Sequence, residues 1–353
     1  MTAVDESAPS MDRRNHPAYR AWTRARPGSP LPTGIEALKP SSAGTAALVE
    51  RRVRSGKTSI FRLHGVAQRG GSVVAKLAPR PVVALERVIY EDVLSGLPLA
   101  SVELLDVVPA NDAPPMDWLF LSDEGDQEWN ELDPFDQQLY AVWLARLHGY
   151  TAASDDLRDL PARGTDHYLS SVRDARVRLG AALHAIDGSK PTEARELAQL
   201  DRLLSRVEAT WATVEEATES LPHTLVHGDL QPKNLRIRRT GTSLDLIALD
   251  WEMAGYGLPA ADLDKQCLVE AASLRARYGT TIRAWVPSLT DDDVLRMVHL
   301  GMVFQVLCAI DWASQSLEHP SKYDKALRYL SVHRATLAEA TARGELSEVF
   351  TWS

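Results

Sequence analysis

The chain has 353 residues, of which 44% are hydrophobic and 25% charged, and its formal net charge is −9. This composition is that of an ordinary globular protein and excludes disordered, collagen-like and coiled-coil chains, while the length suggests about two to three domains or lobes. The two cysteines, Cys267 and Cys308, cannot form a disulfide framework, and the sequence contains no Cys-x-x-Cys zinc pattern.

The excess of acidic residues lies in the second part of the chain. Residues 1–125 contain 15 Lys and Arg against 14 Asp and Glu, whereas residues 126–353 contain 24 against 34. This balance argues against nucleic acid as a partner. The acidic part is consistent with a solvated surface, and it is also consistent with a site for a cationic ligand.

No segment has the pattern of a signal peptide or a membrane span. The N-terminus is acidic and polar. The longest apolar stretch, Leu300–Ala313, is interrupted by Gln305 and Asp311, which makes it too short and too polar to cross a bilayer. We therefore expect a cytoplasmic protein with no membrane partner.

Residues 1–35 contain five prolines interleaved with serines. This pattern predicts a mobile N-terminal arm, with a short helix around Pro17–Arg24.

Residues 36–125 read as a small sheet with one helix. Short apolar or alternating runs predict four strands, and Gly70-Gly71 predicts a turn between the first two. A helix is predicted between Pro81 and Gly96, because the proline suits a first turn and the glycine suits a C-terminal cap. The four predicted strands are Ile60–Leu63, Ser72–Leu77, Leu104–Val108 and Trp118–Leu121.

Residues 126–353 read as mostly helical. Asp133 before Pro134, and Thr290 before three aspartates, are typical of helix starts. One β-rich island interrupts the helices, with a turn at Thr240-Gly241. The island consists of the predicted strands Leu235–Arg238 and Leu244–Leu249, and one predicted apolar helix face runs over Leu197–Trp211.

The most informative segment is LVHGDLQPKN, at residues 225–234. Asn234 follows Asp229 by five residues, and Asp250 follows Asn234 by sixteen, at the end of a second apolar strand. Phosphoryl transfer from a nucleotide needs one carboxylate beside the acceptor hydroxyl. It also needs an amide oxygen and a second carboxylate to hold Mg²⁺ against the phosphates.

The segments HGDLQPKN and LDWE resemble the signature of the aminoglycoside phosphotransferase and choline kinase-like superfamily. The resemblance implies an α+β, two-lobed protein kinase-like fold, with a nucleotide-binding lobe at residues 36–125 and a helical catalytic lobe at residues 126–353. It implies that Asp229 is the catalytic base or the acid that positions the acceptor hydroxyl, that Asn234 and Asp250 bind Mg²⁺, and that ATP or GTP is the phosphate donor.

The resemblance also gives roles to neighbouring residues. His227 is expected to orient the loop, and Gly228 to permit a strained backbone. Asp262 matches an aspartate that braces the catalytic loop in the family. Asp264 is left open between a surface position and one facing the acceptor.

In the first lobe, Lys76 lies inside the apolar run SVVAKL. The resemblance implies that it binds the α- and β-phosphates and pairs with a helix carboxylate. The candidates for that carboxylate are Glu86 and Glu91, and the position of Leu97-Pro98 favours Glu86. The alternative is a Lys76 side chain that points to solvent.

No glycine-rich loop or Walker A motif is present. A shorter loop of small and hydroxyl residues is expected to contact phosphate oxygens through its backbone N–H groups. The adenine-binding hinge is expected after the strand Trp118–Leu121. The loop residues are Ser55, Gly56, Thr58 and Ser59, and the hinge residues are Ser122 and Glu124.

The acceptor is expected between the catalytic loop and the helical lobe, near residues 168–179, 262–270 and 311–317. The acidic excess suits a cationic antibiotic, and the ratio of 31 Arg to 8 Lys indicates a GC-rich genome, which is common among antibiotic producers. We therefore predict a small-molecule O-phosphotransferase that acts on an aminoglycoside, peptide or nucleoside antibiotic and confers resistance. The alternatives are a metabolic kinase of choline, a sugar or an amino alcohol, and a nucleotide-binding pseudokinase.

Overall fold

The computed structural model describes residues 23–24, 48–53, 58–65, 71–186 and 190–342. The chain divides into two compact units. One comprises residues 1–128 and 233–252, and the other comprises residues 129–232 and 253–353. The hairpin at residues 235–248 therefore groups with the first unit, whereas the division made from sequence kept all residues after 125 together.

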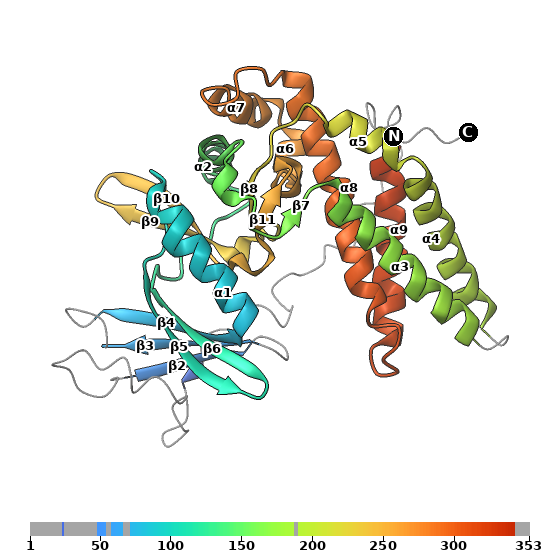
Figure 1. Cartoon of the computed structure of the whole chain (residues 1–353), viewed down its shortest axis with the longest axis horizontal. Coiled ribbons are helices and arrows are strands. Elements are labelled where there is room, and N and C mark those ends of the chain that lie inside the picture. Colours follow the sequence, from blue (N-terminus) through green and yellow to red (C-terminus); the bar gives the residue numbers. More distant parts are fainter. Residues whose placement is uncertain (1–22, 25–47, 54–57, 66–70, 187–189, 343–353) are drawn as a thin grey trace, which may run out of the picture. The chain divides into compact units, whose positions relative to one another are not determined.

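The first unit contains a six-stranded antiparallel sheet in the order β1-β2-β3-β4-β6-β5 (Figure 1). All four strands predicted from sequence are present with longer bounds. The strands are β1 (Thr23–Arg24), β2 (Leu48–Val53), β3 (Ser59–His64), β4 (Ser72–Pro79), β5 (Leu104–Asp112) and β6 (Pro115–Ser122).

Strand β1 lies inside the segment predicted to be an arm with a helix at Pro17–Arg24. That prediction is wrong for Thr23–Arg24, which pair antiparallel with β2. The rest of residues 1–35 lies outside the described residues, as does Gly70 of the predicted turn.

One face of the sheet carries the core of the first unit. Leu63, Val73, Ala75, Trp118 and Phe120 form its buried cluster. Strand residues alternate between faces, so the neighbours of Val73 and Ala75 on β4, Val74 and Lys76, point to the opposite face. This alternation places Val74 and Lys76 on the face opposite the buried cluster.

Helix α1 (Arg80–Val88) follows β4 and packs against β4 and β6 (Figure 1). It begins at the proline-rich turn as predicted, with Pro81 in its first turn. It continues through a π-helical turn, η5 (Ile89–Val93), and a 3₁₀ turn, η6 (Leu94–Gly96), so that the helical segment ends at the predicted glycine. The π-helical turn has no signal in the sequence.

The first unit also contains the hairpin of β9 (Leu235–Thr240) and β10 (Ser243–Ala248). Its register pairs Leu235 with Ala248. Two short 3₁₀ turns flank it, η8 (Pro232–Asn234) and η9 (Trp251–Met253).

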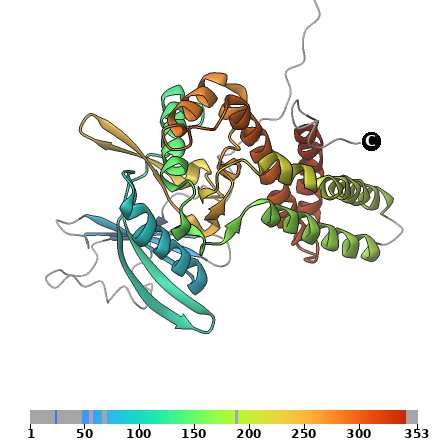
Figure 2. The ribbon, with the colours of Figure 1, turned by 45° about the horizontal axis from the view of Figure 1, so that its top comes forward.

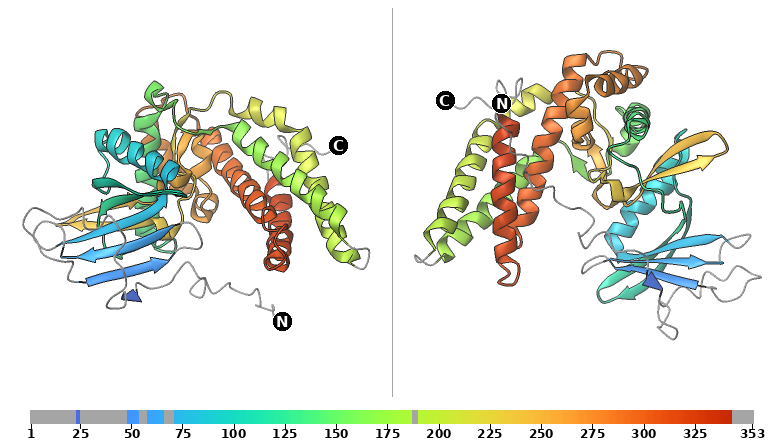
Figure 3. Two further views of the ribbon diagram at one scale, coloured as in Figure 1. Left: turned by 60° about the horizontal axis from the view of Figure 1, so that its bottom comes forward. Right: turned by 180° about the vertical axis from the view of Figure 1, so that it is seen from behind.

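The second unit is mostly helical, and α3, α4, α8 and α9 pack together in it (Figures 2 and 3). A three-stranded sheet has the order β7-β11-β8. The helices are α2 (Pro134–Thr151), α3 (Thr165–Ala185), α4 (Pro191–Ala209), α5 (Trp211–Thr218), α6 (Gln266–Glu270), α7 (Ala272–Ile282), α8 (Asp291–Ser314) and α9 (Tyr323–Thr341). The strands are β7 (Ala162–Arg163), β8 (Thr224–Val226) and β11 (Gly255–Gly257), and the 3₁₀ turns are η7 (Asp155–Leu157) and η10 (Pro259–Asp262).

Both predicted helix starts are confirmed. The Asp133 side chain accepts from the backbone N–H groups of Phe135 and Asp136. Thr290 and Asp293 form a capping box at the start of α8. The face predicted over Leu197–Trp211 is divided instead, because α4 ends before Thr210, whose hydroxyl bonds back to the Arg206 carbonyl.

Helix α8 is the one helix in the described part of the chain that is long and apolar enough to span a membrane by length and composition alone. The expectation that its apolar stretch is too short and too polar is therefore wrong on those two criteria. Its apolar side chains are largely buried against α3, α9 and η10. Burying a Leu, Val or Phe side chain contributes about 1.5–3 kcal/mol. Its composition is therefore explained by its place in the core of the second unit.

A close approach of backbones fixes α8 against η10. A Cβ atom built on Gly301 would lie 2.3 Å from the Ala260 carbonyl oxygen, whereas one on Gly180 of α3 would meet nothing within 4 Å.

We predict that Gly301→Ala lowers the free energy of unfolding by about 1–3 kcal/mol through overpacking. Gly180→Ala should raise it by about 0.5–1 kcal/mol, because alanine favours a helix. Urea denaturation of both variants tests this, and equal effects would contradict it.

Candidate active site

A buried lysine connects three elements of the first unit. The Lys76 Nζ donates to Glu86 Oε1 at 2.9 Å and to Asp250 Oδ1 at 2.6 Å. The Lys76 and Glu86 residues are 4% and 1% exposed. The alternative of a solvent-facing Lys76 is therefore wrong. A cation this deeply buried is stable only with such partners, because removing one would leave an unpaired charge.

The structure also distinguishes the two candidate helix carboxylates. Glu86 points from α1 to Lys76, whereas Glu91 is on the surface and pairs with Arg87 at 2.7 Å. The two glutamates are five residues apart, so they lie on different faces of the helical segment.

The two predicted metal ligands are brought together by the β9–β10 hairpin. Its register places the residue before β9 beside the residue after β10, and the Leu249 N–H donates to the Asn234 carbonyl at 2.8 Å. Asn234 and Asp250 then line one cavity together with Lys76 and Glu86. The spacing of sixteen residues between Asn234 and Asp250 is therefore the length of one hairpin.

This cavity suits a magnesium-bound triphosphate chemically. An amide oxygen and a carboxylate are the hard oxygen ligands that Mg²⁺ prefers, and one or two protein ligands suffice when phosphates supply others. The Asp250 backbone has φ +68°, a conformation that side-chain-bearing residues rarely adopt. Such strain is typical of functional positions.

The predicted hinge residues line the same cavity. The Ser122 hydroxyl donates to Glu124 Oε1 at 2.8 Å, and Arg238 donates to Glu124 Oε2 at 3.0 Å. Sequence reasoning missed Arg62 on β3, which is buried and ion-paired with Asp123 and lines the cavity. The sequence did contain a signal for it, because Arg62 stands inside the apolar run IFRL. The lysine inside the apolar run SVVAKL had indicated an anionic partner on the same grounds.

The predicted phosphate loop is only partly described. Ser55 and Gly56 lie outside the described residues. Thr58 and Ser59 precede and begin β3, and neither is among the described residues that line the cavity. Their role stays a prediction.

The catalytic-loop segment lies in the second unit, directly after β8, where one carboxylate fixes its backbone. Asp262 accepts from the backbone N–H groups of His227 at 2.7 Å and Gly228 at 2.8 Å. The His227 ring accepts from the Asp229 backbone N–H at 3.2 Å. Gly228 has φ +76°, and a Cβ there would lie 2.8 Å from the Met253 carbonyl. These contacts agree with the loop-holding roles expected of Asp262, His227 and Gly228, whereas the catalytic role of Asp229 stays a prediction.

The Asp262 carboxylate is itself held by buried polar groups. His148 Nε2 lies 3.4 Å from Asp262 Oδ2, and His148 Nδ1 lies 2.9 Å from the Tyr278 hydroxyl. Burial alone would raise the pKa of Asp262, but its hydrogen bonds to His148 and His227 outweigh burial and lower that pKa below its usual value. Asp262 is therefore ionised when the loop is formed.

Asp264, which the sequence left open, has a nearly buried side chain that accepts from Lys265 Nζ at 2.8 Å. Burial raises its pKa, and the Lys265 charge opposes that rise. The surface alternative for Asp264 is wrong.

We predict that Glu86→Gln destabilises the protein by about 2 kcal/mol, because it replaces a charge-assisted hydrogen bond of a buried ammonium with a neutral one. It should also weaken nucleotide binding. Denaturant unfolding and a nucleotide titration of the full chain measure both effects. Glu91→Gln is the matched control and should change neither. Equal behaviour of the two variants would contradict the assignment of Glu86.

The Asp262 contacts predict a pH-dependent contribution to stability. Because the folded pKa is lowered, the contribution is present above the ordinary carboxyl pKa near 4 and is lost as the pH falls through the lowered value. Asp262→Asn should therefore unfold more easily than the wild type at pH 7, and the difference should shrink in urea titrations below about pH 4. The exposed Asp159→Asn is the control. A pH-independent difference would show that the carboxylate charge is not the cause.

Comparison with known proteins places this geometry in a family. The sequence profile of the Phosphotransferase enzyme family, APH, matches residues 52–294. Among solved structures, the GDP complex of a mutant aminoglycoside 2'-phosphotransferase is similar with a TM-score of 0.61 and 15% identity, over 87% of this chain and 97% of that one. No curated protein sequence matches this chain significantly.

Two metabolic kinases have similar structures. A choline kinase from Cryptosporidium parvum has a TM-score of 0.53 and 14% identity, over 83% of this chain and 90% of that one. A microcompartment-associated aminopropanol kinase has a TM-score of 0.55 and 12% identity, over 84% and 94%. At these identities the likeness concerns the fold, and it confirms the predicted α+β protein kinase-like class.

Proposed function

The chain belongs to the Phosphotransferase enzyme family, and we propose that it transfers the γ-phosphate of ATP or GTP to a hydroxyl group of an antibiotic-like natural product, which would confer resistance. Membership of the family shows that the protein is a small-molecule phosphotransferase, that is, a kinase that acts on a hydroxyl acceptor.

The single observation that supports the reaction most strongly is the Lys76, Glu86 and Asp250 ion-paired cluster with Asn234 in the same cavity. Lys76, oriented by Glu86, would bind phosphate oxygens of the nucleotide. Asn234 and Asp250 would hold Mg²⁺, which supplies positive charge to the phosphates when bound. An intact set of these groups also argues against a pseudokinase.

Asp229 would orient the acceptor hydroxyl and take its proton. The hydroxyl oxygen forms a bond to the γ-phosphorus as the bond to the bridging oxygen of the β-phosphate breaks, and the nucleoside diphosphate leaves. The Asp262 hydrogen bonds support this role, because they fix the backbone on which Asp229 is carried.

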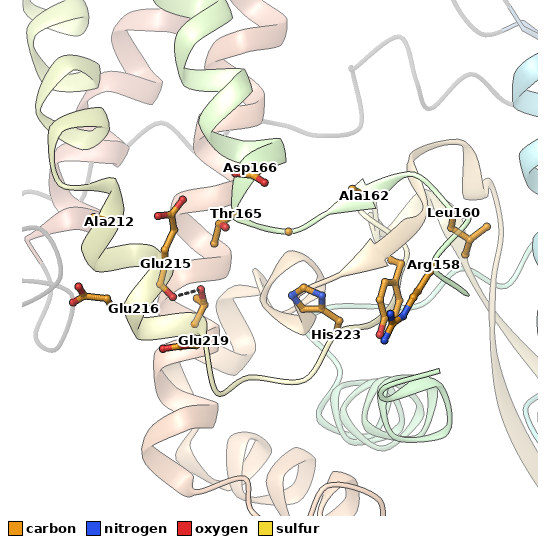
Figure 4. Close-up of a pocket in the computed structure, with 13 residues that line it drawn as sticks. Arg158, Leu160, Ala162, Thr165, Asp166, Ala212, Glu215, Glu216, Glu219 and His223 are labelled. Carbon is orange, nitrogen blue, oxygen red and sulfur yellow. Dashed lines mark hydrogen bonds between the residues drawn. The ribbon is translucent and has the colours of Figure 1, made fainter. Parts of the chain in front are cut away.

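An acidic groove in the second unit supports a cationic acceptor. It has a volume of about 690 Å³, and Asp166, Glu215, Glu216 and Glu219 lie around it (Figure 4). The similar solved proteins include enzymes for aminoglycosides, choline and aminopropanol, compounds that combine hydroxyl groups with a cationic nitrogen.

The position of the groove favours a large acceptor over a small amino alcohol. The groove borders His223 before β8, whereas Asp229 follows the end of that strand. Three strand residues span about 10 Å. An acceptor that places a hydroxyl at Asp229 and a cation in the groove must be extended, which fits an aminoglycoside or peptide antibiotic better than choline.

We predict that Asp229→Asn reduces turnover by at least about a hundredfold, in the range of lost general-base catalysis, while nucleotide affinity is retained. Asp250→Asn should weaken binding of the nucleotide in a magnesium titration. The exposed Asp159→Asn should behave as wild type. Near-normal phosphate transfer by Asp229→Asn would contradict its assigned role.

A coupled assay of nucleotide consumption tests the acceptor. It should cover aminoglycosides, peptide and nucleoside antibiotics, choline, aminopropanol and simple sugars, each with ATP and with GTP. We expect selective turnover of an antibiotic. Selective turnover of choline, a sugar or an amino alcohol would replace the resistance proposal with the metabolic one.

A further inference from the structure

A second, cationic position lies on β7 of the second unit. Strand β7 pairs with β11, where Arg163 is opposite Gly257. A Cβ on Gly257 would lie 2.1 Å from the Arg163 carbonyl oxygen, and a Cβ on Gly255 would lie 2.7 Å from the Arg163 Cγ. Two glycines therefore permit a close approach that fixes both the backbone and the side-chain stem of Arg163.

The Arg163 guanidinium lies beside the catalytic loop. Its Nε donates to the Met253 carbonyl at 2.9 Å, which is the same carbonyl that lies against Gly228. The Met253 side chain is 42% exposed and is also adjacent to Gly228. Arg163, Met253 and Gly228 thus form one patch, and Asp229 is the next residue along the chain.

Among the residues that the structure describes, none supplies a negative charge to pair with Arg163. Within the described part of the chain no carboxylate is ion-paired with it, and its second polar contact is to His167 Nδ1 at 3.4 Å. Burial lowers the pKa of the Arg163 guanidinium below its usual value. Other arginines of this unit are paired with carboxylates, as Arg173 is with Glu208.

The titratable neighbours of Arg163 are neutral at pH 7. Burial, followed by the Arg163 charge, lowers the pKa of His167 to about 4. Burial raises the pKa of Tyr168 well above its usual value and that of Cys308 to about 11. His167, Tyr168 and Cys308 therefore supply no charge to offset the guanidinium.

An unpaired, partly buried cation has a physical cost that a ligand can offset. A hydrogen bond to the Met253 carbonyl uses only one N–H donor. A guanidinium has five N–H donors in a planar arrangement that matches an oxyanion. With Nε bound to the protein, donors of the fork remain for a carboxylate or phosphate.

We propose that Arg163, with His167 and Met253 beside it, forms a subsite that binds an oxyanion group of the acceptor next to the hydroxyl that is phosphorylated. This inference rests on the proposed phosphotransfer reaction and adds to it that the acceptor is amphoteric. Ala162 and Gly164, the neighbours of Arg163, line the acidic groove. Residues 162–164 therefore carry the proposed cation subsite on one side and the proposed oxyanion subsite on the other.

The first experiment does not depend on turnover. Phenylglyoxal modifies arginine side chains, and mass spectrometry of the full-length protein would follow Arg163 and the carboxylate-paired Arg173 separately. At constant ionic strength, inorganic phosphate or malonate should slow modification of Arg163 at least about threefold, while glycerol or chloride should not. Protection by malonate alone assigns the subsite to a carboxylate, and protection by phosphate alone assigns it to a phosphate group. Equal rates in all additives would overturn the proposal.

The second experiment uses the acceptor found in the consumption screen. Arg163→Gln keeps a donor for the Met253 carbonyl but removes the charge. It should raise the acceptor KM at least about tenfold, because the acceptor loses a charge-assisted hydrogen bond. The nucleotide KM and the melting temperature should stay unchanged, and Arg163→Lys should be intermediate.

The matched control is Arg173→Gln on the surface of α3, which should leave all constants unchanged. An unchanged acceptor KM in Arg163→Gln would overturn the subsite, even where the wild type is an active kinase. Absence of any acceptor turnover by the wild type would instead count against the proposed function, and phenylglyoxal protection would then decide the subsite alone.

Discussion

The structure of the first unit depends on one buried ammonium group. Lys76 reaches its position because strand alternation turns it away from the apolar core, and it is stable there because Glu86 and Asp250 accept from it. The helix that carries Glu86 and the segment that carries Asp250 are far apart in the sequence, and both contact the Lys76 ammonium group. A single desolvated charge therefore fixes the relative positions of the strand, the helix and the segment that carries Asp250.

In the second unit a buried carboxylate has the corresponding role. Asp262 binds two consecutive backbone N–H groups of the loop before Asp229, and a histidine and a tyrosine hold the carboxylate in turn. The strained backbone at Gly228 persists because these contacts over-determine it. Both units thus use buried ionic groups to hold the segments that carry the candidate site residues.

Two electrostatic environments in the second unit are the basis of the acceptor that we propose. The groove of Asp166, Glu215, Glu216 and Glu219 attracts cations, whereas the unpaired Arg163 beside the loop attracts an oxyanion. The net charge of the chain indicated only the acidic groove. It could not indicate Arg163, because one arginine changes little in a total dominated by carboxylates. An amphoteric acceptor satisfies both environments, and a simple cation satisfies one.

The local signals in the sequence determined most strands, both helix starts and the motif residues, since apolar periodicity, capping and the spacing from Asp229 to Asn234 are short-range properties. They could not determine that β1 forms from an apparently unstructured arm or that Arg62 is buried, because both depend on partners far away in the chain. The division at Thr210 was missed although its cause is local, a hydroxyl that bonds back to the Arg206 carbonyl. The spacing from Asn234 to Asp250 became a geometric fact only when the hairpin register placed both in one cavity. The pairing of Lys76 with Asp250 is likewise decided by tertiary packing, because the two residues are far apart in the sequence. Pairs such as Arg87 with Glu91 are local, because the two residues are one helical turn apart.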